Sequence, residues 1–270
     1  MRLAEVTGAE LLVLKVLDPR LDCATSRAPT LAKAAAEVAA RWVSELEDLI
    51  ADLRVRASVV VDTKARDEDV AAAVLRVAVR RRVRIISMAT RGAGVVRRAL
   101  LGSVATAILG KTSLPVMVTG ERVRPPRESL PYHALVTSDG SLAAEAVLPP
   151  LRRVFEQTPP EHFRITLLRV YVEALADPLH DIAIEQCRRE LAAFKRHAPR
   201  RFPVDQVVRE TVRLGGVDTA ILNTASEVGA DAIWMATHGH SLRRQVLLGS
   251  VALGALSRAE VPIVLERASR

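Results

Sequence analysis

The chain has 270 residues, of which 49% are hydrophobic and 3% aromatic, and its formal net charge at pH 7 is +8. This hydrophobic content excludes a disordered chain, and the scarcity of aromatic rings argues against a surface that stacks nucleic-acid bases. Cys23 and Cys187 lie far apart, outside any CxxC motif, and the apolar runs are too short to cross a bilayer, so we expect a soluble cytoplasmic protein.

The first part of the chain alternates strand patterns with helix patterns. Strands are predicted at 10–17, 56–62, 84–89 and 115–119, and helices at 29–53, 68–82 and 103–111. This alternation is typical of a parallel sheet with helices on both faces. Residues 121–131 follow, with two adjacent prolines and several charges, and we interpret them as a linker.

The second part, 132–270, repeats the alternation in full. Strands are predicted at 133–138, 164–172, 207–215, 231–236 and 262–266, with helices at 141–156, 178–197, 216–228 and 250–258. We therefore expect two tandem Rossmann-like domains, 1–120 and 132–270, each an open parallel sheet of the five-stranded type with helices on both faces.

An internal duplication relates the two parts. A shift of 147 residues places MATRGAGVVRRALLGSVA (88–105) on MATHGHSLRRQVLLGSVA (235–252), with eleven of the eighteen pairs identical. We call 1–120 the first repeat and 132–270 the second repeat.

The first repeat lacks its opening strand. If Val16 corresponds to Val170, Met1 falls opposite Phe155, and nothing corresponds to the strand at 133–138. That strand would lie in the middle of the sheet, and a gap there leaves backbone groups unpaired. Either the chain begins upstream of Met1, or a partner supplies the strand.

Each repeat carries a glycine loop of the pattern Gly, nine residues, Gly-Ser, between a strand and a helix. The N-terminus of a helix has unpaired N–H groups and the positive end of the helix dipole, which together attract an anion. The second glycine lets a phosphate oxygen approach the backbone closely, and the serine adds a hydroxyl. The loop therefore indicates a phosphate site beyond the carboxyl ends of the strands, where Asp139 also falls.

These residues resemble the universal stress protein family, in which the motif reads Gly, two residues, Gly, nine residues, Gly and Ser or Thr. The second repeat reads Ala236-Thr237-His238-Gly239, nine residues, Gly249-Ser250, and "SDGS" at 138–141 is similar to the end of the family's first strand. The first repeat has the same spacing, from Ala89 through Gly92 to Gly102-Ser103.

The resemblance implies ATP binding, with Mg²⁺ accompanying the nucleotide. By position, Asp139 would contact the nucleoside and Val170 the adenine, while Met235 and Ala236 would line the floor. The residues implied to hold the phosphates are Gly239, Gly249, Ser250 and Val251, with Gly92, Gly102 and Ser103 as their counterparts in the first repeat.

The sequence departs from the family pattern in three ways. Ala236 and Ala89 replace the first glycine, Thr137 stands where the family has Pro or an apolar residue, and the first repeat has no counterpart of Asp139. We therefore expect ATP to bind in the second repeat, and weakly or not at all in the first.

No nucleophile–base motif, HExxH motif or P-loop lysine is present, so we expect a signalling or regulatory protein with at most slow intrinsic ATP hydrolysis. His238 and His240 form an H-x-H, but no Cys or carboxylate lies nearby in sequence to complete a metal site. A nucleotide-free interaction module that dimerises through its sheet edges remains an alternative, and we expect a homodimer or a pseudo-dimer between the repeats.

Overall fold

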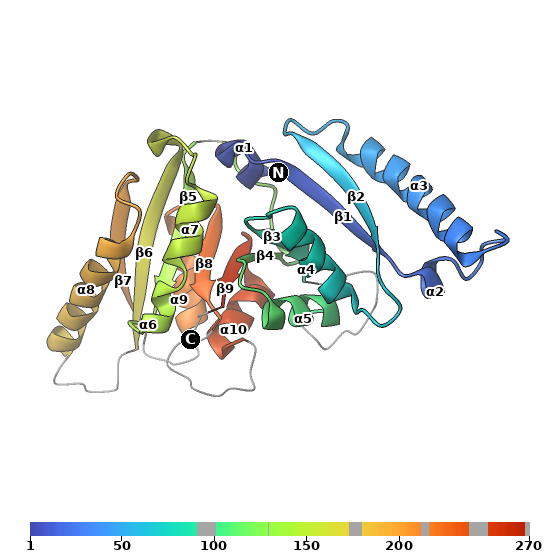
Figure 1. Cartoon of the computed structure of the whole chain (residues 1–270). Helices are drawn as coiled ribbons and strands as arrows, with labels where there is room; N and C mark the ends of the chain where they lie inside the picture. Colours follow the sequence, from blue (N-terminus) through green and yellow to red (C-terminus); the bar gives the residue numbers. More distant parts are fainter. Residues whose placement is uncertain (91–100, 129, 173–179, 212–215, 238–247, 268–270) are drawn as a thin grey trace. The chain divides into compact units, whose positions relative to one another are not determined.

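The computed structural model describes the chain except residues 91–100, 129, 173–179, 212–215, 238–247 and 268–270 (Figure 1). The described residues form two compact units, Met1–Val83 and Arg84–Arg270. Within the described parts of both units, no helix combines the length and the apolar character needed to span a membrane.

The first unit contains a two-stranded parallel sheet and its helices. Its elements are α1 (Arg2–Thr7), β1 (Leu11–Leu17), α2 (Pro19–Asp22), α3 (Leu31–Ile50), β2 (Ala57–Thr63) and α4 (Val70–Arg80). Two N-caps begin the long helices: Thr30 Oγ1 accepts from the Lys33 N–H at 3.2 Å, and Asp69 Oδ1 accepts from the Ala72 N–H at 2.6 Å. Leu17, fully buried, lies in the core cluster that packs α3 against the sheet.

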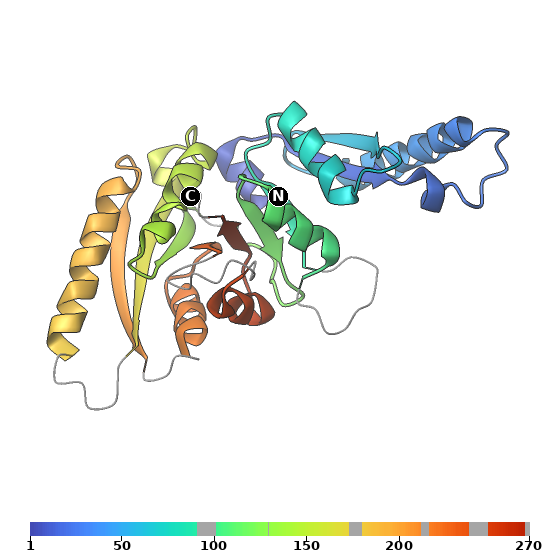
Figure 2. The same cartoon turned by 60° about the horizontal axis from the view of Figure 1, so that its bottom comes forward.

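The second unit contains the remaining elements. They are β3 (Ile86–Ala89), α5 (Ser103–Lys111), β4 (Val116–Thr119), β5 (Tyr132–Ser138), α6 (Leu142–Glu145), α7 (Leu148–Val154), a 3₁₀ turn (Pro160–His162), β6 (Phe163–Val172), α8 (His180–His197), β7 (Val204–Thr211), α9 (Val217–Glu227), β8 (Ala232–Ala236), α10 (Ser250–Arg258) and β9 (Ile263–Glu266). Figure 2 shows α8 running alongside β7.

Seven strands form the sheet of the second unit, in the order β3-β4-β9-β8-β5-β6-β7. The five strands of the second repeat, β9-β8-β5-β6-β7, are parallel to one another, which confirms the predicted Rossmann-like sheet. The closing strands of the two repeats are antiparallel neighbours, with Val118 opposite Ile263.

The strands of the first repeat form two separate pairs, β1 with β2 and β3 with β4. In the second repeat, β6 and β8 are the counterparts of β1 and β3, and both pair with β5. The described residues before β1 include no counterpart of β5, the strand that lies between the corresponding strands in the second repeat. The side chains of β1 are half-buried up to Leu17, whereas most of those in β6 are buried.

The helix predicted at 141–156 is two helices, α6 and α7. Pro149 and Pro150 have no N–H groups to donate to the carbonyls of the preceding turn, so a continuous helix cannot form there. Prolines are well accommodated in the first turn of a helix, and α7 begins accordingly.

Aromatic packing fixes α7 against the sheet of the second unit. Phe155, at the end of α7, stacks on Phe163 of β6 with ring centroids 3.7 Å apart, and it also contacts Tyr132 and Trp234. All four rings are buried. This cluster sets the position of β5 and β6, whose opposite ends carry the candidate site.

One ion pair recurs in both repeats with its charges exchanged. Asp62 of β2 pairs with Arg80 of α4 at 3.3 Å, and Arg209 of β7 pairs with Glu227 of α9. Asp62 and Arg209 are 147 residues apart, as are Arg80 and Glu227. This is the same shift that aligns the glycine loops. The duplication therefore preserves the contact between strand and helix although both side chains differ.

Candidate functional site

The candidate site lies beyond the carboxyl ends of β5 and β8. From β5 the chain continues through β6 and β7 on one side, and then returns to form β8 and β9 on the other. The strand order therefore reverses beside β5, and in open α/β sheets ligands bind at this switch point. Asp139 follows β5 directly, and Ala236 is the last residue of β8.

Asp139 forms a compact turn with Ser141. Its Oδ1 accepts from the Ser141 N–H at 3.0 Å and from the Ser141 hydroxyl at 2.5 Å. The Ser141 hydroxyl oxygen also accepts from the Ala144 N–H at 3.3 Å and so caps α6. The carboxylate is held at the strand end and remains half-buried.

Gly249 is the N-cap of α10, and none of the described side chains caps this helix. Its N–H donates to the Thr237 carbonyl at 3.0 Å, which ties the helix start to the end of β8. Its backbone is extended, with φ −65° and ψ 159°, and an added Cβ would lie 3.6 Å from its nearest neighbour, the Thr237 oxygen. The described residues therefore leave room for a side chain at this position.

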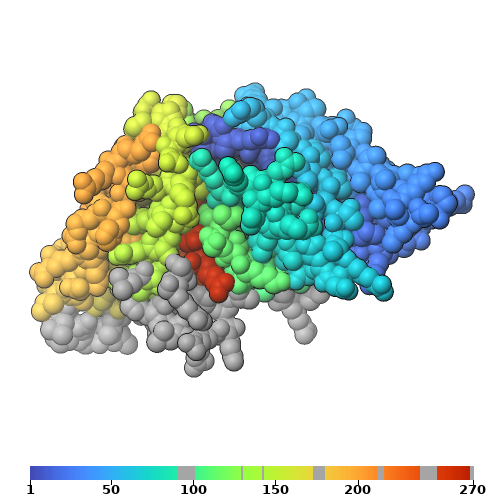
Figure 3. Space-filling model, in the orientation of Figure 1, coloured from blue at the N-terminus to red at the C-terminus, as the bar shows by residue number. Residues whose placement is uncertain are grey.

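The helix start is accessible from solvent. Ser250 is exposed and Val251 half-buried, and the space-filling view shows α10 at the surface of the second unit (Figure 3). An uncapped helix N-terminus with an exposed hydroxyl is suited to an anion, because its N–H groups have no partners within the helix.

The predicted adenine contact, Val170, lies on β6, and the predicted floor residues, Met235 and Ala236, lie on β8. Val170 and Met235 are 8% and 4% exposed, and Ala236 is half-buried. Ala236 pairs in the sheet with Glu266 of β9. The structure therefore places Asp139, Val170, Met235, Ala236, Gly249, Ser250 and Val251 at the carboxyl edge of one sheet or at the helix start that follows it.

Several residues singled out from the sequence lie outside the described part of the chain. They are Gly92, Gly239, His238 and His240. Among the described residues, no group of three or more His, Cys, Asp or Glu side chains is arranged to hold a metal ion.

Three charged residues near the site were not predicted. Arg169 of β6 and Glu190 of α8 form an ion pair at 3.2 Å, next to Val170 and Gly140. Glu266 is 5% exposed, and its Oε2 has no hydrogen-bond partner among the described residues. Burial raises the pKa of Glu266 to about 8, and the nearby Arg153 opposes this shift. A charged residue within an otherwise apolar strand is the signal in the sequence that could have identified Arg169 and Glu266.

The first repeat reproduces the helix start but not the strand ends. Gly102 caps α5 as Gly249 caps α10, its N–H donates to the Thr90 carbonyl at 2.8 Å, and Ser103 is exposed. An added Cβ at Gly102 would lie 3.7 Å from the Thr90 oxygen. The two glycines are therefore matched in geometry.

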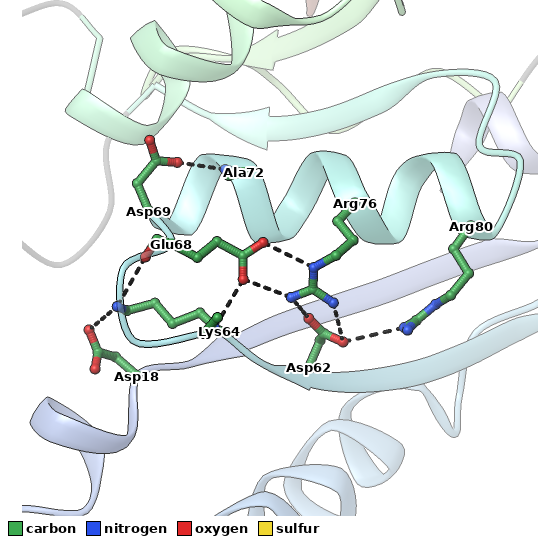
Figure 4. Close-up of polar contacts among 9 residues, drawn as sticks. Asp18, Asp62, Lys64, Glu68, Asp69, Ala72, Arg76 and Arg80 are labelled. Atoms are coloured by element: carbon green, nitrogen blue, oxygen red, sulfur yellow. Dashed lines mark hydrogen bonds and ion pairs between the residues drawn. The ribbon is translucent and has the colours of Figure 1, made fainter.

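Charged side chains fill the carboxyl ends of β1 and β2 (Figure 4). Lys64 pairs with Asp18 at 3.0 Å, and Arg76 of α4 pairs with Asp62 at 2.8 Å and with Glu68 at 2.9 Å. The Arg76 hydrogen bond is the main cause that lowers the pKa of Glu68 to about 2. This network of paired charges joins both strand ends to the start of α4.

The model of the Universal stress protein family matches residues 1–120 and again residues 133–267. The comparison with curated proteins yields no match.

Two solved structures illustrate the likeness in fold. A universal stress protein from Archaeoglobus fulgidus DSM 4304 has a TM-score of 0.59 and 20% identity, and the match covers 96% of this chain and 86% of that one. A putative universal stress protein from Pseudomonas aeruginosa UCBPP-PA14 has a TM-score of 0.56 and 12% identity, and the match covers 99% of this chain and 95% of that one. The two family matches together span nearly the whole chain, which therefore belongs to the universal stress protein family as a tandem member.

Proposed function

We propose that the second repeat binds ATP with Mg²⁺ and that the protein uses this binding as a regulatory signal in a stress response. The sequence has no nucleophile–base motif or P-loop lysine, so we expect at most slow intrinsic hydrolysis.

The observation that carries the proposal is the start of α10. Neither the backbone angles of Gly249 nor its neighbours among the described residues require a glycine, since an added Cβ would make only an ordinary contact at 3.6 Å. A glycine that the fold does not need, at an uncapped helix N-terminus beside the switch point, is explained by a ligand whose oxygen approaches the backbone.

The other end of the crevice suits a nucleoside. Asp139 presents a carboxylate to which ribose hydroxyls can donate, and Val170 offers backbone groups beside a buried apolar surface. In this arrangement the triphosphate lies at Gly249, Ser250 and Val251, with Gly239 as a further contact expected from the family motif.

The first repeat is expected to bind ATP weakly or not at all. It keeps Gly102 and Ser103 but has no counterpart of β5, and therefore none of Asp139. At the ends of β1 and β2, ion-paired side chains such as Lys64 and Asp18 are present instead.

Gly249 and Gly102, which have matched geometry, allow a controlled test of ATP binding. Gly249→Val should weaken Mg-ATP binding by about tenfold or more, because the side chain occupies the space a phosphate oxygen needs. Gly102→Val makes the same change at the same kind of N-cap and should leave ATP affinity unchanged. Calorimetric titration measures the affinity, and thermal unfolding measures the stability of both variants.

Two results would contradict the proposal. If both variants bind ATP as the unaltered chain does, Gly249 does not hold phosphate. If Gly249→Val loses ATP binding only in proportion to a loss of folded protein, the glycine serves the fold.

The alternative function is a nucleotide-free interaction module of the same fold. The observation that favours it is β1, which pairs only with β2 among the described strands and has half-buried side chains. An open strand edge can accept a strand from another chain. The antiparallel pairing of β4 with β9 within one chain supports a pseudo-dimer of repeats in either case.

A further inference from the structure

Glu266, the last residue of β9, carries a buried carboxyl group at the carboxyl end of the sheet. The residue is 5% exposed, and its Oε2 has no hydrogen-bond partner among the described residues. A buried polar atom without a partner costs folding free energy, and most buried carboxyl groups are paired or hydrogen-bonded. The presence of an acid at this position therefore calls for a functional explanation.

Two backbone hydrogen bonds connect Glu266 to the start of α10. The Thr237 N–H donates to the Glu266 carbonyl at 2.8 Å, and the Gly249 N–H donates to the Thr237 carbonyl at 3.0 Å. Thr237 is 2% exposed, so this connection lies inside the protein. A single buried residue thus separates the strand end that carries the acid from the uncapped helix N-terminus.

The first repeat has the same backbone connection but a neutral residue in place of the acid. Thr119 lies 147 residues before Glu266. Its carbonyl accepts from the Thr90 N–H at 2.9 Å, and the Thr90 carbonyl accepts from the Gly102 N–H at 2.8 Å. The Thr119 hydroxyl donates to the Met88 carbonyl at 3.3 Å. The acid is therefore found only in the repeat for which we propose ATP binding.

The described surroundings of Glu266 do little to stabilise an ionised carboxylate. Burial raises the pKa of Glu266 to about 8, and Arg153 of α7 is the charged group that opposes this shift. Neither β4 nor β8, the two strands paired with β9, carries an ionisable side chain. In α10, Arg258 pairs with Asp218 of α9, and Arg267, which follows Glu266, donates to a backbone carbonyl of α5. The carboxyl is therefore mostly neutral at pH 7 and becomes charged above about pH 8.

Glu68 of the first unit shows the opposite design. Its carboxylate accepts hydrogen bonds from Arg76, which is the main cause that lowers the pKa of Glu68 to about 2. A carboxyl held by a cation in this way stays ionised at every physiological pH. Glu266 lacks such a partner among the described residues, and its charge can therefore change with pH.

We propose that Mg-ATP binding at the start of α10 is coupled to a proton on Glu266, so that the site binds phosphate tightly while the carboxyl is neutral and weakly once it is ionised. This coupling presupposes the proposed ATP site. A neutral acid places no charge beside the triphosphate, whereas a buried carboxylate repels it through surroundings that screen charge poorly. Glu266 acts on the ligand through its charge.

The coupling works in both directions, so bound ATP should also make Glu266 hold its proton more tightly. Two unit charges about 10 Å apart near a protein surface interact by roughly the free energy of a tenfold change in affinity. With a coupling of that size, Mg-ATP affinity should fall about fivefold between pH 7 and pH 9. Binding at pH 8.5 should take up roughly half a proton per ATP, and binding at pH 7 almost none.

Calorimetric titration of the full chain with Mg-ATP at pH 7.0, 8.5 and 9.0 tests the coupling. Each titration is made in two buffers of different ionisation enthalpy, and the difference in heat gives the number of protons taken up. The terminal phosphate of ATP, with a pKa of about 6, stays ionised over this range. Glu266→Gln should bind Mg-ATP at pH 7.0 as the unaltered chain does, without the proton uptake at pH 8.5 and without the fall in affinity at pH 9.0.

Two further variants separate the charge of Glu266 from other effects. Glu260→Gln removes an exposed acid between α10 and β9 that pairs with Arg124 at 2.6 Å, and it should keep the pH dependence of the unaltered chain. Arg153→Met removes the cation that opposes the shift at Glu266, so the fall in affinity should begin at a higher pH. Thermal unfolding at each pH measures the folded fraction. If Glu266→Gln does not fold, Glu266→Thr introduces the side chain that the first repeat carries at this position.

The outcomes distinguish this coupling from the ATP site itself. If the unaltered chain binds no ATP at any of the three pH values, the proposed function and the coupling both fail. If it binds ATP with the same affinity at all three and takes up no proton, only the coupling fails. A pH dependence that persists unchanged in Glu266→Gln would assign the proton to another group and would likewise overturn the role of Glu266.

Discussion

Gly140 and Gly249 both lie at the candidate site, but the two positions differ in whether the fold itself requires glycine. Gly140 has φ +81°, a backbone conformation that residues other than glycine rarely adopt, so the fold itself favours glycine there. Gly249 has an extended backbone, and the described residues leave room for a Cβ. The sequence identifies both glycines in motifs, but only the backbone angles and neighbours separate a glycine needed for folding from one available to a ligand.

Glu266 gives a prediction at the scale of one residue. Its folded pKa is about 8 because the carboxyl is buried, whereas its ordinary value is 4.5. The folded state therefore holds the proton more tightly than the unfolded state, and stability falls as the pH rises from about 4.5 to about 8. Glu266→Gln removes this titration. The free energy of unfolding of the variant, relative to that of the unaltered chain, should therefore increase between pH 4.5 and 8, by at most about 5 kcal/mol.

Urea unfolding at pH 4.5, 6.5 and 8.5 measures this difference. Glu260→Gln, at a half-exposed side chain paired with Arg124, is the control and should change the stability little, as exposed ion pairs contribute little. A difference between Glu266→Gln and the unaltered chain that stays constant over the three pH values would mean that the carboxyl does not titrate in this range.

At the scale of elements, the alternation of apolar and polar residues predicted the strands and most helices of both repeats. The helix over 250–258 and the strands near 164–172 and 231–236 lie where the pattern placed them. The division into α6 and α7 was missed, although Pro149 and Pro150 are visible in the sequence and cannot donate backbone hydrogen bonds. Side-chain pairs between elements, such as Arg169 with Glu190, depend on how a helix packs on the sheet and are not coded by local spacing.

The charged network of the first unit gives a prediction at this scale. Hydrogen bonding from Arg76 lowers the pKa of Glu68 to about 2 from an ordinary value of 4.5. The stability that Glu68 contributes is therefore present above pH 4.5 and is lost as the pH falls toward 2. Glu68→Gln should reduce stability at pH 7 and should make the unfolding of the chain less dependent on pH in this window.

Acid titration followed by circular dichroism, with urea unfolding at pH 7, measures both effects. Glu45→Gln removes the exposed Arg41–Glu45 pair of α3 and serves as the control, with little change expected at either pH. If Glu68→Gln behaves as Glu45→Gln does, the contacts drawn in Figure 4 do not contribute to stability.

At the scale of the whole molecule, the duplication in the sequence predicted two repeats, and the glycine-loop motif in each predicted the family, which matches both repeats. It did not predict that the four remaining strands would form two separate pairs, or that β4 would join β9. Those pairings are contacts between segments distant in sequence, and they depend on which strand edges remain open after each repeat folds. For the same reason, the sequence motifs pointed to Asp139, Val170 and Gly249, whose roles remain predictions, but not to nearby charged residues such as Arg169 and Glu266.

The measurement that tests the central claim most directly is calorimetric titration of the full chain with ATP in the presence of Mg²⁺, read for stoichiometry as well as affinity. We predict one site per chain, because only the second repeat combines the Asp139 turn with an uncapped helix start at Gly249. Two sites would show that the first repeat binds nucleotide without a counterpart of β5. No binding at millimolar ATP would contradict the nucleotide site altogether and leave the interaction module as the function of this fold.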